Sequence, residues 1–150
     1  MRAVLETVEA QSRELFPKGK AILVAVSGGV DSMVLLYTLN HLSKQYKWRL
    51  VVGHYNHRLR GSASRADQRL VEKSARKLGL DCVVGQWEQD ANSIKEHGPE
   101  MAARLARHEF LAQAAKKRRC RIIAMAHHSN DQVETFLWRL MRGAGGKGLG

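Results

Sequence analysis

The stretch AILVAVSGGVDS, residues 21–32, decides the fold of this 150-residue chain. Its first six residues form a continuous apolar run, which is typical of a strand buried on both faces of a sheet. The next six contain two glycines and two serines, and the apolar pattern of residues 33–39 predicts a helix. A buried strand, a glycine-rich loop and a helix in this order predict an α/β unit with its loop at the carboxyl end of the strand.

The same alternation continues along the chain. Further strands are predicted at residues 49–54, 81–87 and 122–126, and further helices at residues 4–15, 65–78, 99–119 and about 130–142. Repeated strand–helix units predict a doubly wound parallel sheet with helices on both faces. The loops after the first, second and fourth strands should then share one crevice at the carboxyl edge of the sheet.

Charge and cysteine content narrow the class of protein. The chain has 25 Lys and Arg against 14 Asp and Glu, a formal net charge of +11, which favours polyanions such as nucleic acid and, secondarily, anionic membrane surfaces. Its two cysteines, Cys82 and Cys120, are too few and too far apart for a disulfide framework or a CxxC metal site. With no long apolar run and an acidic residue at position 6, we expect a cytoplasmic protein without a membrane span or signal peptide.

The glycine-rich loop has the composition of a phosphate cradle. Glycines let backbone N–H groups approach an anion, and the following helix contributes its N-terminal donors. Hydroxyls of Ser27 and Ser32 can donate to phosphate oxygens, whereas Asp31 fits beside phosphates only if it holds a cation such as Mg²⁺. The alternative is a tight turn in which Asp31 or Ser27 caps the helix.

Two more polar segments follow the second and fourth predicted strands. In HYNHRLRG, residues 54–61, the arginines suit phosphate or RNA better than the histidines suit a metal; a solvated basic loop is the alternative. In HHSNDQVET, residues 127–135, Asp131 and Glu134 lie one turn apart on the predicted helix. They could bind Mg²⁺, hold a cationic co-substrate or accept a proton from an amine, or they could simply complement the helix dipole.

These segments together resemble a known family. SGGVDS at 27–32 resembles the SGGxDS motif of the PP-loop ATP pyrophosphatases. HxNHxLR at 54–60, an Ala-Arg-rich helix at 100–107, HHxxDQxET at 127–135 and RGxGxxGL at 142–149 are similar to the tRNA(Ile)-lysidine synthetase branch of that family. Two positions depart from its pattern, since Asn130 replaces a usual Asp and His108 replaces a common Tyr.

The resemblance implies a specific reaction. The wobble cytidine of a tRNA(Ile) with a CAU anticodon would be adenylated by ATP at its C2 oxygen with release of pyrophosphate. Free L-lysine would then attack through its ε-amine and release AMP. On this reading residues 1–150 are an N-terminal PP-loop ATP-binding catalytic domain, and further domains are expected after residue 150.

The resemblance also implies roles for individual residues. The expected catalytic residues are Asp31, Asp131, Glu134 and Arg104, with Asp31 as the Mg²⁺ ligand. The expected ATP-binding residues are Ser27, Gly28, Gly29, Val30, Asp31, Ser32 and His54. The expected tRNA or phosphate contacts are His57, Arg58, Arg60, Arg107 and Arg142, although Arg104 and Arg107 could instead form an exposed helix face.

Three other functions fit part of the sequence. A PP-loop tRNA thiolase shares the first motif but needs clustered cysteines, and a glutamine-dependent amidating synthetase would carry different second and third motifs. A non-catalytic basic RNA-binding module would explain the net charge of +11 but would leave residues 27–32 without a role.

Overall fold

The structure of the chain is a computed structural model. It describes residues 6, 9–10, 18–56, 61–88, 90–129 and 132–139, and for residues 127–129 and 132–139 it describes the backbone only. Most of the predicted helix at residues 4–15 therefore lies outside the described residues.

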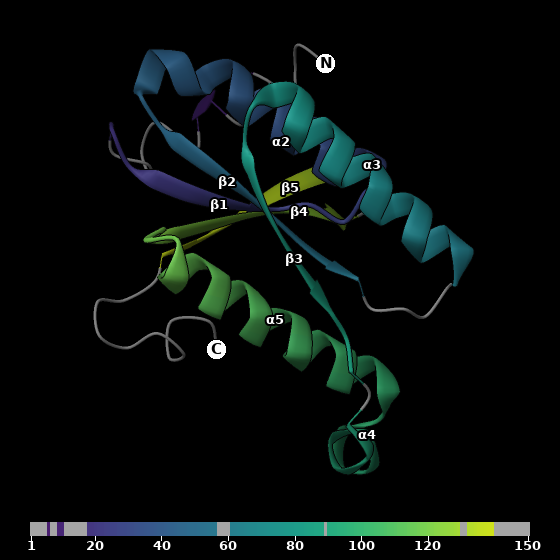
Figure 1. The fold of residues 1–150 in the computed structure, drawn as a ribbon. Helices are drawn as coiled ribbons and strands as arrows, with labels where there is room; N and C mark the ends of the chain where they lie inside the picture. Colours follow the sequence, from purple (N-terminus) through teal and green to yellow (C-terminus); the bar gives the residue numbers. More distant parts are fainter. Residues whose placement is uncertain are drawn as a thin grey trace.

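The elements alternate as the sequence predicts. In chain order they are β1 (Ala21–Ala25), α2 (Val30–Tyr46), β2 (Arg49–Asn56), α3 (Ser62–Leu78), β3 (Asp81–Gln86), α4 (Ala91–His97), α5 (Pro99–Lys117), β4 (Ile122–Ser129) and β5 (Gln132–Arg139). The sheet has the order β3-β2-β1-β4-β5, and its first four strands are parallel. The predicted parallel α/β sheet is confirmed, with α4 as an additional short helix that the sequence did not suggest (Figure 1).

Helices cover both faces of the sheet, and β1 is buried between them (Figure 1). On one face Ile22 and Val24 pack in a cluster with apolar residues of α2 and α3. On the other face Leu23 packs in a second cluster with Leu111 and Ala115 of α5. Because alternate residues of a strand point to opposite faces, this double burial explains why residues 21–26 are apolar without interruption.

The predicted helix at residues 130–142 is wrong, because residues 132–139 form strand β5. This strand pairs antiparallel with β4, from Ile122 opposite Arg139 to Ser129 opposite Gln132. The segment QVETFLWR contains Val133, Thr135, Phe136 and Trp138, which are β-branched and aromatic residues that favour strands. Pairing with β4 satisfies the backbone groups along an edge of the parallel sheet that would otherwise stay open.

Candidate functional site

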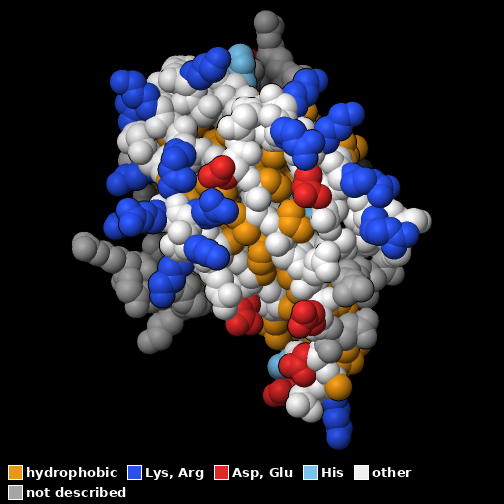
Figure 2. All heavy atoms as spheres, in the orientation of Figure 1, with side chains coloured by type: hydrophobic (Ala, Val, Ile, Leu, Met, Phe, Trp, Pro, Cys, Tyr) orange, Lys and Arg blue, Asp and Glu red, His pale blue; other side chains and the backbone are white. Residues whose placement is uncertain are grey.

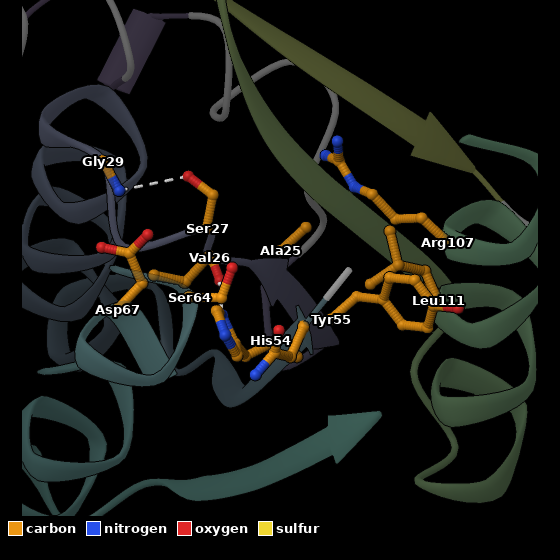
Figure 3. A pocket seen from close by; sticks show the side chains of 12 residues that line it. Ala25, Val26, Ser27, Gly29, His54, Tyr55, Ser64, Asp67, Arg107 and Leu111 are labelled. Atoms are coloured by element: carbon orange, nitrogen blue, oxygen red, sulfur yellow. Dashed lines mark hydrogen bonds between the residues drawn. The ribbon is translucent and has the colours of Figure 1, made fainter. Parts of the chain in front are cut away.

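A pocket lies at the carboxyl edge of β1 and β2, the edge at which ligands collect in parallel α/β sheets. Its volume is about 180 Å³. The lining residues come from β1 and the loop after it, β2, α3 and α5: Ala25, Val26, Ser27, Gly29, Gly53, His54, Tyr55, Asn56, Ser64, Asp67, Arg107 and Leu111 (Figure 3). The loop after β1 and the carboxyl end of β2 therefore line one crevice, while residues 57–60 after β2 and residues 130–131 after β4 lie outside the described residues.

Hydrogen bonds between two serines hold the glycine-rich loop in shape. The backbone N–H of Ser27 donates to Oγ of Ser32 at 3.0 Å, and the two hydroxyls also lie 3.0 Å apart. Oγ of Ser32 donates to the carbonyl of Gly29 at 3.0 Å, while Oγ of Ser27 accepts from the N–H of Gly29 at 3.2 Å. Ser32 is buried and does not line the pocket, whereas Ser27 is exposed and does. In this conformation Ser32 shapes the loop, and Ser27 is the hydroxyl that faces the pocket.

Gly28 brings the loop against helix α3. Its φ of +96° lies in the region that favours glycine, and a Cβ at this position would lie 2.9 Å from Cβ of Asp67. The next residue, Gly29, is the N-cap of α2 and has no side-chain cap. Neither glycine places a side chain at the N-terminus of α2, so the helix presents its first backbone N–H groups, which are the donors that an anion needs.

A hydrogen bond from His54 of β2 reaches Val26, the residue that follows β1. Only 2% of its surface is exposed, and its Nδ1 lies 2.7 Å from the carbonyl oxygen of Val26. A carbonyl oxygen can only accept, so Nδ1 carries the hydrogen, and in the neutral imidazole Nε2 is left as an acceptor. This Nε2 atom is buried and has no hydrogen-bond partner among the residues that the structure describes.

The two arginines of α5 differ in their surroundings. Arg107 lines the pocket, and burial, assisted by the positive charge of Arg104, lowers the pKa of its guanidinium. Arg104 is exposed and does not line the pocket. The expectation named Arg104 as catalytic and Arg107 as a tRNA or phosphate contact; the geometry brings Arg107, and not Arg104, to the pocket (Figure 3).

Two carboxylates lie near the glycine-rich loop. Asp31 occupies the first turn of α2 and does not line the pocket, while Asp67 of α3 lines it directly across from Gly28. Within the described part of the chain, no three His, Cys, Asp or Glu side chains gather to form a complete metal site. A cation here would depend on one or two protein carboxylates together with ligand oxygens, which is the usual arrangement for Mg²⁺ on nucleotide phosphates.

Several pocket residues were not found from the sequence. Tyr55, Ser64, Asp67 and Leu111 line the pocket although none was expected as a site residue: Tyr55 is a variable position of the HxNHxLR motif, and Leu111 lies beyond the Ala-Arg-rich segment of α5. Tyr55 packs on Phe110 of α5 with ring centroids 5.4 Å apart. Burial, then the charges of Glu109 and Glu88, raise the pKa of its phenol, so Tyr55 stays neutral near pH 7.

Several other predicted site residues are not among those that line the pocket. His57, Arg58, Arg60, Asp131 and Arg142 lie outside the described residues. Glu134 lies in β5, where its backbone is opposite His127 of β4, so it is not one helical turn from Asp131 as expected. Val30 begins α2 and is 78% exposed.

A second pocket of about 420 Å³ adjoins the first and shares Asn56 and Ser64 with it. Its other lining residues are Gly61, Arg65, Gln68, Arg69 and Gln86. Arg65 and Arg69 are both exposed and lie four residues apart on α3, so they are neighbours on one helix face. On the face shown in Figure 2, Lys and Arg side chains predominate over the upper part and acidic side chains gather towards α4.

The two cysteines are remote from these pockets. Cys82 lies at the start of β3 and Cys120 just before β4, which is the amino edge of the parallel sheet. Burial raises the pKa of both thiols, to about 11 for Cys82. Neither thiol is poised to act as a thiolate ligand or nucleophile near pH 7.

Comparison with known proteins adds a family assignment. Residues 4–150 match the family model described as the PP-loop domain. The chain is 43% identical over 150 residues to the tRNA(Ile)-lysidine synthase of Geobacter sulfurreducens, an alignment that covers 98% of this chain and 32% of that protein. It is 39% identical to the enzyme of the same name from Clostridium tetani, over 97% of this chain and 31% of that protein. The chain thus spans about a third of the length of these two curated relatives.

A solved structure shares the fold. A tRNA thiolase from Methanococcus maripaludis, determined with its 4Fe-4S cluster, superposes with a TM-score of 0.74, covering 87% of this chain and 46% of that one. At 19% sequence identity this likeness supports the architecture alone. None of the helices that the structure describes is both long and apolar enough to span a membrane.

Proposed function

This chain belongs to the PP-loop domain family, and from that premise we propose that it carries out ATP-dependent lysidine formation on a tRNA. The relatives that support this choice within the family bear the name tRNA(Ile)-lysidine synthase and align along nearly the whole chain. The substrates of the proposed reaction are ATP, free L-lysine and a tRNA(Ile) with a CAU anticodon, and its expected location is the cytoplasm.

The observation that carries the proposal is the pocket below the glycine-rich loop. Ser27 and Gly29 line one side of it and Arg107 lines another, so loop donors and a partly buried cation face one space. Backbone N–H groups at a helix N-terminus, a hydroxyl and a guanidinium are the donors that bind phosphate. An ATP phosphate chain in this pocket would lie between them.

In the first half-reaction the cytosine O2 attacks the α-phosphorus of ATP, and pyrophosphate leaves. Negative charge grows on the phosphate oxygens, so the barrier falls where fixed donors already point at them. Arg107 supplies such a charge from a partly buried position, which strengthens its interaction with an anion because less water screens it. We therefore assign the catalytic arginine role to Arg107 instead of Arg104.

The acidic residues near the loop fit Mg²⁺. This ion favours oxygen ligands, commonly one or two carboxylates together with nucleotide phosphates, and Asp31 and Asp67 are the described carboxylates at the loop. Bound there, it would neutralise charge on the phosphates. Asp31 remains the ligand that the family motif favours, and Asp67 is the second candidate because it lines the pocket.

In the second half-reaction the ε-amine of lysine attacks C2 of the adenylated cytosine, the bond from C2 to the activated oxygen breaks, and AMP leaves with that oxygen. An ammonium has no lone pair, so a base must take a proton from the amine. Asp131 and Glu134 are the proposed residues for this step and for holding the lysine cation, on the strength of the HHxxDQxET motif.

Sulfur transfer and passive RNA binding suit the chain less well. The two cysteines lie at the opposite edge of the sheet from the pocket, and burial raises the pKa of both thiols. A basic RNA-binding module would need no partly buried arginine in a pocket with a glycine-rich loop. Sulfur transfer would therefore lack a reactive thiolate, and passive RNA binding would leave the pocket without a use.

The test is pyrophosphate release measured with ATP and four combinations of substrate: none, tRNA(Ile), lysine, and both. We expect release that depends on the tRNA and a lysine-modified tRNA only when both substrates are present. Asp131→Ala and Glu134→Ala should each lower lysidine formation far more than ATP binding. Salt-sensitive tRNA binding without any pyrophosphate release would instead favour a non-catalytic module.

A further inference from the structure

His54 lines the pocket and has a buried acceptor atom that the described residues leave without a hydrogen bond. Only 2% of the residue's surface is exposed, and Nδ1 donates to the carbonyl of Val26 at 2.7 Å. The other ring nitrogen, Nε2, is buried without a partner among the described residues, although His54 lines the pocket. Leaving a buried acceptor unpaired costs free energy, so a bound ligand with a hydrogen-bond donor would be favoured at this position.

The position of His54 limits which ligand group can pair with Nε2. Because Val26 immediately precedes Ser27, the Nδ1 bond fixes the ring beside the start of the glycine-rich loop. A phosphate oxygen is itself an acceptor, so it would face the lone pair of Nε2 unfavourably. The partner must present an N–H or O–H group, which on ATP means the adenine amino group or the ribose hydroxyls.

The surroundings of His54 favour a flat base. Ala25, Gly53 and Leu111 line the same pocket, and they offer small or apolar surface from β1, β2 and α5. Gly53 is packed tightly, since a Cβ there would lie 3.2 Å from Leu23 and 3.3 Å from Leu111. Tyr55 adds an aromatic ring to the lining (Figure 3), and this ring packs on that of Phe110. Apolar walls with one orienting polar group are typical of sites for heteroaromatic rings.

We propose that Nε2 of His54 accepts a hydrogen bond from the exocyclic amino group of adenine and so selects ATP over GTP. Adenine has an amino group at C6, whereas guanine has a carbonyl oxygen there, which would place two acceptors against each other. The bond from Nδ1 to Val26 maintains this selectivity, because it fixes the tautomer that leaves Nε2 without a hydrogen. The inference rests on the proposed function, since it takes ATP to be the nucleotide.

The first arm of the test uses the unmodified chain and changes the nucleotide. Equilibrium binding by calorimetry is compared for ATP, GTP and purine riboside triphosphate, which lacks the amino group but keeps the ring. We expect purine riboside triphosphate to bind about ten-fold more weakly than ATP, the loss typical of one buried hydrogen bond, and GTP to bind more weakly still. Equal affinity for ATP and purine riboside triphosphate would overturn the proposal.

The second arm uses two matched substitutions. His54→Asn keeps a donor near the position of Nδ1, for the Val26 carbonyl, and removes the acceptor at Nε2. His54→Gln can keep an acceptor near the position of Nε2 and gives up the bond to Val26. We expect His54→Asn to bind ATP and purine riboside triphosphate equally, and His54→Gln to retain part of the preference for ATP.

Other outcomes separate this proposal from the proposed function. If His54→Asn weakens the binding of ATP and of purine riboside triphosphate by the same factor, His54 contacts a group that the two nucleotides share. Adenine selection through Nε2 is then wrong, while the proposed use of ATP stands. If His54→Asn still prefers ATP about ten-fold, another group reads the amino group, and the proposal fails. If the unmodified chain binds no ATP at all, both the proposed function and this inference fail. Because the first arm needs no substitution, a variant that does not fold leaves the proposal testable.

Discussion

Gly28 and Asp67 lie so close that no side chain fits between them. A Cβ on Gly28 would lie 2.9 Å from Cβ and 3.2 Å from Cα of Asp67. The glycine-rich loop can therefore approach helix α3 this closely only because residue 28 has no side chain. The two residues are 39 positions apart in the sequence. Their contact places the carboxylate of Asp67 in the lining of the same pocket as Ser27 and Gly29.

This contact predicts the effect of Gly28→Ala. The new methyl group would collide with α3 and force a φ of +96° on a residue that avoids it, at a cost of about 1–3 kcal/mol in the free energy of unfolding. We expect nucleotide binding to fall at least ten-fold because the loop must move. The matched control is Gly19→Ala, where φ is +80° but nothing lies within 4 Å, so stability should fall without a loss of nucleotide affinity. Urea denaturation and nucleotide titration measure the two effects, and equal affinity losses in both variants would contradict the prediction.

Arg107 and Arg104 should differ sharply in a pair of alanine variants. Arg107 lines the pocket, so Arg107→Ala should lower the rate of pyrophosphate release by about 10²–10³-fold, the usual loss for one donor to a charged transition state. Arg104→Ala removes an exposed charge and should change that rate by less than about five-fold. Single-turnover assays with saturating ATP and tRNA provide the comparison, and a larger effect from Arg104 would reverse the assignment.

Arg65 and Arg69 should contribute to tRNA affinity through charge. Both line the second pocket, which adjoins the first, so an RNA strand approaching the reacting base would pass near them. We expect Arg65→Ala and Arg69→Ala together to weaken tRNA binding and to lower the slope of log affinity against log salt by about 2, one for each lost phosphate contact. Arg76→Ala is the control, since Arg76 is an exposed residue in the last turn of the same helix, away from the carboxyl edge of the sheet. An unchanged salt slope in the double variant would argue against phosphate contacts here.

The thiol of Cys82 should affect stability only at alkaline pH. Burial, then the charge of Glu72, raises its pKa to about 11, above the value of about 8.5 for a thiol in an unfolded chain. The folded state thus retains the proton to higher pH, so the stabilisation is complete below about pH 8.5 and is lost as pH rises towards 11. Cys82→Ala should therefore show a flatter decline of unfolding free energy between pH 8.5 and 10.5 than the unmodified chain. The same variant should keep the rate of pyrophosphate release within about two-fold of the unmodified chain at pH 7.5, because Cys82 is remote from the pockets. A greater loss would indicate that the thiol takes part in the reaction.

Local sequence patterns predicted the core of the fold correctly but failed at one edge. Residues 21–26 are apolar without a break because both faces of β1 are covered, and that burial can be read from the residues themselves. Residues 132–139 were predicted as part of a helix over about 130–142 and form β5 instead. Their register depends on pairing with β4, and pairing between strands is a property of the tertiary structure that spacing along one segment does not encode.

The sequence by itself determined that a glycine-rich loop joins a buried strand to a helix, because that information lies in twelve consecutive residues. Only the tertiary structure decided which distant side chains meet that loop. The packing of α5 on the sheet turns Arg107 towards the pocket and leaves Arg104 outside, and the packing of α3 brings Asp67 against Gly28. The bond between His54 and Val26 likewise forms only when β2 lies beside β1, and it leaves Nε2 as an acceptor for a ligand. Helix and strand patterns specify which residues face inward, whereas convergence on a site depends on how separate elements pack against one another.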